Sequence, residues 1–191
     1  MAFHRRIAIL FLCVIFLSIP LASCSENDKR GTGPVVEIEL ERGIIQVRLD
    51  SDAAPATVGN FVKLVEEGFY DGLTIHYIIP GTLIQGGDPE GTGQGGLPDK
   101  IPGEFLANGH ENPISFERGV IGMARRSSDY NSASCQFFIT AADVSYFDEL
   151  YAGFGYVVKG MDVVDGIAAM EADGRGVPAE TVVIKSIRIK G

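Results

Sequence analysis

Cysteine and histidine are scarce in this chain, which has three of each among its 191 residues. No cluster of cysteine, histidine and carboxylate residues has the spacing of metal ligands, so a metal site is not expected. Cys135 lies directly before Gln136, Phe137 and Phe138 in an apolar stretch. In that setting a packed thiol is a better interpretation than a catalytic nucleophile.

Basic residues are also in short supply, with 16 lysines and arginines against 25 aspartates and glutamates and a net charge of −9. Nucleic acid is therefore not an expected partner, because binding its phosphate backbone requires a basic surface. Solubility alone would explain such an acidic composition. The content of 46% hydrophobic and 21% charged residues predicts an ordinary globular domain with one core.

The sequence lacks an apolar run long enough for a permanent transmembrane helix, which needs about 20 residues. A shorter apolar run, residues 7–17, follows His4, Arg5 and Arg6, and this arrangement is typical of a signal peptide. We expect residues 1–23 to be removed on export. Loss of the two arginines would shift the net charge from −9 to −11.

The end of this segment, Leu21-Ala22-Ser23-Cys24, resembles the bacterial lipobox, in which the cysteine becomes the lipid-modified first residue of the mature protein. This predicts lipidation of Cys24 and a lipid-anchored protein on the extracytoplasmic face of a bacterial cell membrane. The alternative, an ordinary small residue near a conventional cleavage site, stays open. With Cys13 removed, Cys135 would be the sole cysteine in the folded part, so no internal disulfide is expected.

Residues 24–34 are polar and rich in charge and glycine, which predicts a flexible tether, and the domain is expected over residues 35–191. Val36, Ile38 and Leu40 alternate with glutamates, which is the period of a half-buried strand. Gly43 is placed to turn the chain into a second strand that runs through Leu49. The domain is therefore expected to start with a hairpin.

The rest of the domain predicts short strands and two helices. Pro55 suits the first turn of a helix that ends at Gly68, and a second helix is expected over residues 161–170. The strand candidates are residues 73–78, 83–86, 120–124, 136–140, 153–157 and a last strand around 187–190. This pattern predicts a mainly β fold, a closed barrel capped by helices, because closure removes exposed strand edges.

The segment Gly91–Gly96 matches the dinucleotide-binding pattern G-x-G-x-x-G. That pattern binds a pyrophosphate only where it opens a helix, and here Pro98 and Pro102 follow. We therefore interpret the segment as a system of turns rather than a cofactor site.

Four blocks of sequence together resemble the bacterial cyclophilins. They are Phe69-Tyr70-Asp71-Gly72-Leu73-Thr74-Ile75-His76, Ile84-Gln85-Gly86-Gly87-Asp88-Pro89, Gly122-Met123-Ala124-Arg125 and Asn131-Ser132-Ala133-Ser134-Cys135-Gln136-Phe137-Phe138-Ile139. The resemblance runs in order from about Val35 to Ile189. It implies an eight-stranded antiparallel barrel with two capping helices, and peptidyl-prolyl cis-trans isomerase activity on X-Pro bonds without a cofactor.

The resemblance also implies roles for individual residues. Gln85 matches the glutamine that holds the substrate backbone, and the other matched positions belong to the groove and its proline pocket: Leu83, Met123, Ala124, Phe138 and Phe147. Taken alone, Met123, Phe138 and Phe147 would be read as barrel core at strand spacing. The matched blocks around them favour the pocket.

Three positions depart from the family. Tyr77 stands where the family has its catalytic arginine, Thr82 replaces a pocket phenylalanine, and Tyr151 replaces a histidine before the Phe-Gly pair. We hypothesise that Tyr77 occupies the arginine position and that its hydroxyl donates a weaker hydrogen bond. Arg125 belongs to the usual Met-Ala-Arg pattern of bacterial members and is not assigned the missing role.

Two functions follow from the resemblance. The first is an isomerase that assists the folding of exported proteins by binding their proline-containing segments and stabilising the twisted X-Pro bond, because slow X-Pro isomerisation can limit folding. The second is a non-catalytic module that holds proline-containing peptides as a chaperone or docking domain, which the loss of the arginine at Tyr77 favours. A monomer is the default expectation.

Overall fold

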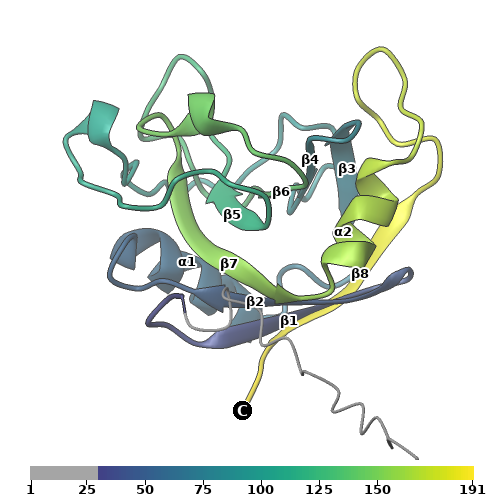
Figure 1. Ribbon diagram of the computed structural model, residues 1–191, viewed down its shortest axis with the longest axis horizontal. Coiled ribbons are helices and arrows are strands. Elements are labelled where there is room, and N and C mark those ends of the chain that lie inside the picture. The colour runs from purple at the N-terminus through teal and green to yellow at the C-terminus, as the bar shows by residue number, and fades with distance from the viewer. Residues whose placement is uncertain (1–29) are drawn as a thin grey trace, which may run out of the picture.

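The computed structural model describes residues 30–191, and eight antiparallel strands in it close into a barrel (Figure 1). The order around the barrel is β1-β2-β7-β5-β6-β4-β3-β8. The strands are β1 Val35–Leu40, β2 Gly43–Leu49, β3 Thr74–Ile79, β4 Leu83–Gly86, β5 Val120–Met123, β6 Phe137–Thr140, β7 Ala152–Lys159 and β8 Val182–Ile189. The predicted fold class is confirmed.

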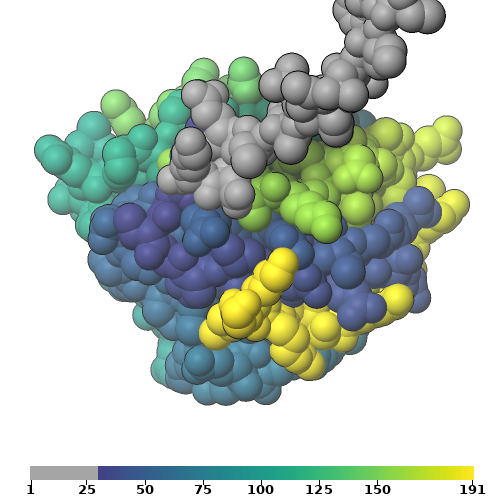
Figure 2. Space-filling view, turned by 60° about the horizontal axis from the view of Figure 1, so that its bottom comes forward, coloured from purple at the N-terminus to yellow at the C-terminus, as the bar shows by residue number. Residues whose placement is uncertain are grey.

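The first and last strands complete the closure. β1 pairs with β2 across a tight turn. Gly43, the first residue after that turn, has a φ of 140°, a value that residues with a Cβ rarely adopt. On its other edge β1 pairs with β8, where Val36 lies opposite Ile189. Figure 2 shows the N-terminal strands in purple and blue beside the C-terminal strand in yellow. β8 begins several residues earlier than the alternation around residues 187–190 had indicated.

Two helices pack on the barrel. α1 spans Pro55–Glu66 with its proline in the first turn, and Gly68 follows it with a φ of 68°. α2 spans Met161–Ala168 and ends two residues before the predicted limit. Both helices bury apolar side chains in the same core cluster as the barrel interior, including Phe61 and Ile167, which are fully buried. Each such side chain contributes about 1.5–3 kcal/mol through burial.

Two short 3₁₀ turns, Leu106–Asn108 and Ser145–Phe147, interrupt the long loops on either side of β5 and β6. Within residues 30–191 no helix is both long and apolar enough to cross a membrane. Among the described residues, the buried residues of the main core all fall between Val36 and Ile187.

The signal peptide predicted over residues 1–23 and the lipidation site predicted at Cys24 lie outside the described residues. The last part of the predicted tether does not behave as a free linker. The Gly33 amide donates to the Leu49 carbonyl over 3.0 Å, and the Arg30 guanidinium lies 3.1 Å from a Glu117 carboxylate oxygen. Residues 30–34 are therefore attached to the domain along β2.

Strand alternation gives the sheet formed by β3, β4, β6 and β5 two apolar faces. Alternate residues such as Ile84 and Phe137 point into the barrel and join the main core. Their neighbours Leu83 and Phe138 belong to a second, separate cluster. Because successive side chains of a strand point to opposite faces, this second cluster lies on the outer surface of the barrel. It is the foundation of the candidate site.

Candidate functional site

The second cluster gathers most of the residues that the sequence analysis had assigned to a groove. Leu83 and Phe138 are 3% exposed, and half-buried side chains pack against them. Those half-buried neighbours include Tyr77, Ala124, Phe147 and Tyr151. Four separate segments of the chain thus supply one apolar surface, and the structure brings these six predicted residues together.

Aromatic rings form the floor and one wall of this surface. The ring centroid of Phe138 lies 5.6 Å from that of Phe147 and 5.7 Å from that of Tyr151, both in edge-to-face arrangements. Phe116 stacks on Phe138 from the other side at 5.5 Å. Such pairs contribute about 0.5–1.5 kcal/mol each beyond the burial of their area. The rings are therefore held in place and present a fixed apolar pocket.

Met123 does not belong to this surface. Its side chain is 2% exposed and lies in the main core with Phe137 and Ile121. Neighbours along a strand point to opposite faces, so the outward position of Ala124 requires Met123 to point inward. The assignment of Met123 to the proline pocket is corrected accordingly: it is a barrel core residue.

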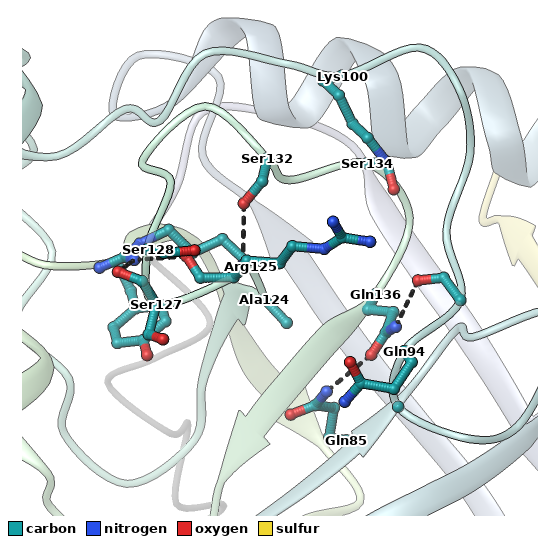
Figure 3. A pocket seen from close by; sticks show the side chains of 14 residues that line it. Gln85, Gln94, Lys100, Ala124, Arg125, Ser127, Ser128, Ser132, Ser134 and Gln136 are labelled. Carbon is teal, nitrogen blue, oxygen red and sulfur yellow. Dashed lines mark hydrogen bonds between the residues drawn. The ribbon is translucent and has the colours of Figure 1, made fainter.

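The polar part of the site is a pair of glutamines, Gln85 on β4 and Gln136 directly before the neighbouring strand β6. Gln85 on β4 donates from its Nε2 to the Oε1 of Gln136 over 2.8 Å. Gln136 in turn donates from its Nε2 to the Gly95 carbonyl over 2.9 Å, as Figure 3 shows. Gln136 therefore fixes the orientation of Gln85, and sequence reasoning had given it no role. Its position two residues before Phe138, on the same face by strand period, was the available signal.

The glycine-rich segment Gly91–Gly96 is a loop folded around a buried carboxylate. Asp88, 1% exposed, accepts hydrogen bonds from the amides of Glu90, Thr92 and Gly95 at 2.9, 3.0 and 3.3 Å. Burial by itself would raise the pKa of Asp88, but these backbone donors outweigh it and lower the pKa. The loop places the Gly95 carbonyl against Gln136. The segment forms turns and opens no helix, as the turn interpretation predicted.

Tyr77 lies beside Gln85 at the edge of the groove. The two residues are paired across β3 and β4, and both line a cavity of about 650 Å³. Among the residues described, no hydrogen-bond partner is present for the Tyr77 hydroxyl, and Gly176 packs against its ring. A Cβ at Gly176 would collide with that ring, so glycine is required there. The phenol is thus held against the loop before β8, with its hydroxyl available.

His76 lies on the same cavity behind Tyr77. Its side chain is 6% exposed, and neither ring nitrogen has a hydrogen-bond partner within the described chain. Burial lowers the pKa of His76, although the charge of Asp88 opposes the shift. The imidazole is therefore neutral at pH 7 and does not replace the cation that the family has at position 77.

The other two departures differ in their effect. Tyr151 packs on Phe138 and Phe147 and closes one wall of the apolar pocket. Thr82 does not belong to the cluster; its carbonyl accepts the Ala141 amide over 2.7 Å and its side chain is half-exposed. The pocket therefore keeps its aromatic floor but lacks an aromatic side chain at Thr82.

Arg125 is engaged in structural contacts. Its guanidinium lies 4.7 Å from the ring centroids of both Tyr130 and Tyr151 and 5.1 Å from that of Phe105. It also donates two hydrogen bonds to the Leu150 carbonyl. Three ring faces and a carbonyl leave this cation fixed beside the groove, where it supports Tyr151.

The described residues contain no group of three or more histidine, cysteine, aspartate or glutamate side chains able to hold a metal ion. Burial raises the pKa of the Cys135 thiol, so it is protonated at neutral pH and unsuited to nucleophilic attack. The groups that the site offers are an apolar pocket and polar side chains able to form hydrogen bonds. An apolar pocket beside an oriented amide suits an apolar ring attached to a peptide backbone.

Comparisons with known proteins agree with this geometry. The family model for cyclophilin type peptidyl-prolyl cis-trans isomerases matches residues 35–189. The chain is 35% identical over 187 residues to peptidyl-prolyl cis-trans isomerase A of Dickeya dadantii, covering 93% of this chain and 96% of the relative. A peptidyl-prolyl cis-trans isomerase of Acinetobacter baylyi is 37% identical over 165 residues, covering 82% and 85%.

A solved structure gives the same result. The crystal structure of a cyclophilin type isomerase of Cryptosporidium parvum, described as being in the presence of the dipeptide Ala-Pro, is 28% identical to this chain with a TM-score of 0.73. The match covers 82% of this chain and 99% of the chain in that structure. A second structure of that protein has a TM-score of 0.77 at 27% identity, with 84% and 99% covered. The chain belongs to the cyclophilin-type peptidyl-prolyl cis-trans isomerase family.

Proposed function

We propose that this protein isomerises X-Pro bonds in exported polypeptides and that the bond is twisted in the groove between Gln85 and Phe138. The observation that carries the proposal is one outer face with two parts. An aromatic pocket fits a proline ring, and beside it a glutamine, fixed by Gln136, can hold the neighbouring peptide group.

The barrier to rotation of a peptide bond is about 18–20 kcal/mol because resonance joins the nitrogen to the carbonyl. Twisting removes the resonance, so the proline nitrogen regains a lone pair that can accept a hydrogen bond. A donor aimed at that nitrogen stabilises the twisted state more than either planar state. We assign this role to the Tyr77 hydroxyl, which lines the same cavity as Gln85. No covalent step is needed.

The Tyr77→Phe variant tests this role because it removes only the hydroxyl. A neutral hydrogen bond contributes about 0.5–1.5 kcal/mol, so we expect kcat/KM to fall about 2- to 13-fold. The matched control is Tyr130→Phe, at a side chain 38% exposed whose ring packs on Phe105 rather than on the pocket rings. Isomerisation of a short X-Pro peptide is followed by NMR exchange. An unchanged kcat/KM in Tyr77→Phe would exclude the hydroxyl as the donor.

The second candidate function is a binding module that holds proline-containing segments without accelerating isomerisation. The observation that favours it is the neutral side chain at position 77, where the family has an arginine; a charged donor contributes about 1.5–3 kcal/mol, more than a phenol. The two functions share the pocket of Phe138 and Tyr151 and differ in rate alone. Peptide binding that is measurable while isomerisation stays at the uncatalysed rate would identify the binding module.

We further propose that the mature protein is anchored through lipid on Cys24 and acts on the extracytoplasmic face of a bacterial cell membrane. The support is the basic start, the short apolar run and the lipobox-like residues 21–24. Mass spectrometry of the mature N-terminus tests it. A diacylated cysteine, lost in Cys24→Ala, supports the anchor, and an unmodified N-terminus at or after residue 24 contradicts it.

A further inference from the structure

A second cavity, of about 510 Å³, adjoins the groove and shares Gln85, Ala124, Gln136 and Tyr151 with it. Figure 3 shows this cavity with Gln85, Gln94 and Gln136 on one side and Ser127 and Ser128 on the other. A peptide bound along Gln85 would therefore extend a side chain into it. The groove residues do not explain the composition of its remaining walls.

The charged residues on these walls are all basic: Lys100, Arg125 and Arg126. No aspartate or glutamate lines the cavity, although acidic residues outnumber basic ones 25 to 16 in the whole chain. The nearest acidic residues in sequence, Asp99 and Asp129, are outside the lining. Because every charged side chain of the lining is basic, the cavity has a positive local potential and attracts an anion.

The three cations differ in availability. Arg125 is enclosed by aromatic rings and donates to the Leu150 carbonyl, as described above. Arg126 has no ion pair and no side-chain hydrogen bond within residues 30–191, although its backbone amide donates to Ser132 Oγ over 2.8 Å. Lys100 donates to the Leu97 carbonyl, which leaves its charge uncompensated. Arg126 and Lys100 can therefore both turn toward a bound anion.

The hydroxyl groups on the walls add further donors. Ser132 and Ser134 are already used as donors, to the Asp129 carbonyl over 2.6 Å and to Cys135 Sγ over 3.7 Å. The hydroxyls of Ser127 and Ser128 have no hydrogen bond in the described part of the chain. An ammonium, a guanidinium and two free hydroxyls match the acceptor oxygens of a carboxylate or a phosphate ester.

Resting on the function proposed above, we propose that this cavity selects substrates that carry a negatively charged side chain close to the proline. The anion is a carboxylate or a phosphate ester, bound by Lys100 and Arg126 while the proline ring lies in the aromatic pocket. Both cations are exposed, so solvent and salt screen each contact. We expect a preference of about 3- to 10-fold over a neutral side chain at low ionic strength.

The test uses a set of X-Pro peptides in which glutamate or its neutral counterpart glutamine occupies each of three positions before and two after the proline. The affinity ratio of each pair is measured by fluorescence polarisation with residues 25–191, which contain all eight strands of the barrel and both helices. Measuring binding rather than rate keeps the result independent of whether the groove catalyses isomerisation. Phosphoserine peptides form a parallel series.

We expect glutamate to be preferred at one position, and the preference to disappear in the double variant Lys100→Gln/Arg126→Gln. The matched control Arg42→Gln/Lys63→Gln removes the same charges from the turn between β1 and β2 and from α1, and should keep the ratio. A ratio near one at every position for both anions, or a preference that survives in the first double variant, would overturn the proposal. Stronger binding of phosphoserine than glutamate assigns the phosphate ester, and the reverse assigns the carboxylate.

Discussion

Replacing Gln136 with alanine should lower activity indirectly, because Gln136 holds Gln85 in place through a hydrogen bond. The substitution removes the acceptor for Gln85 Nε2 and the donor to the Gly95 carbonyl. If orienting Gln85 is worth one neutral hydrogen bond, about 0.5–1.5 kcal/mol, kcat/KM falls about 2- to 13-fold. The free energy of unfolding should also fall by about 1–3 kcal/mol, because the Gly95 carbonyl loses its partner.

A double-mutant cycle separates positioning from general damage. In a Gln85→Ala background the additional Gln136→Ala change should leave kcat/KM almost unaltered, because the residue it orients is gone. Gln46→Ala is the matched control: Gln46 also donates from its side chain, to Glu37 over 2.9 Å, but lies on β2 away from the groove. Additive losses of kcat/KM in the cycle, or an unchanged kcat/KM in folded Gln136→Ala, would refute the claim that Gln136 orients Gln85.

Three other expectations concern the pocket and its buried charges. Phe138→Ala should lower the free energy of unfolding by about 3–5 kcal/mol in urea titrations, since three rings lose their common contact; a loss under 1 kcal/mol would contradict the packing. The lowered pKa of His76 means that the unfolded chain binds a proton first as pH falls below about 6.5, so stability is present above that pH and declines below it. His76→Asn should show a smaller decline between pH 7 and pH 5. The lowered pKa of Asp88 gives stability that is present above its unfolded pKa of about 3.9 and is lost as pH falls further. Asp88→Asn should therefore unfold with a lower urea midpoint at pH 7, and equal midpoints at that pH would disprove the role of the carboxylate in the loop.

The sequence predicted the elements well because their signals are local. The glutamate alternation in β1, the glycine that begins β2 and the proline that begins α1 each act within a few residues, and each element formed where expected. β8 was recognised only at its end, because its first half is apolar without alternation. Helix α2 was predicted two residues too long. The Ala169 amide still donates to the Asp165 carbonyl, four residues back, but the Met170 amide donates to the Ile167 carbonyl, three residues back, so the α-helical pattern ends there.

The site was predictable where strand period alone decides which face a residue occupies. Leu83, Ala124 and Phe138 were found, and the same rule would have excluded Met123, which adjoins Ala124 on one strand. What could not be predicted depends on contacts between distant segments. Gln136 reaches a carbonyl 41 residues away in sequence, and Gly176 packs on Tyr77 over a still larger separation in sequence.

The most direct test of the account is the rate of cis-to-trans isomerisation of a short X-Pro peptide with residues 25–191, compared with the Tyr77→Arg variant. The account expects clear acceleration by the native domain, with the phenol acting as a weaker donor, and a further increase in the variant if the guanidinium reaches the same position. Peptide binding without acceleration by the native domain, with activity appearing in Tyr77→Arg alone, would contradict it and identify a proline-peptide binding module.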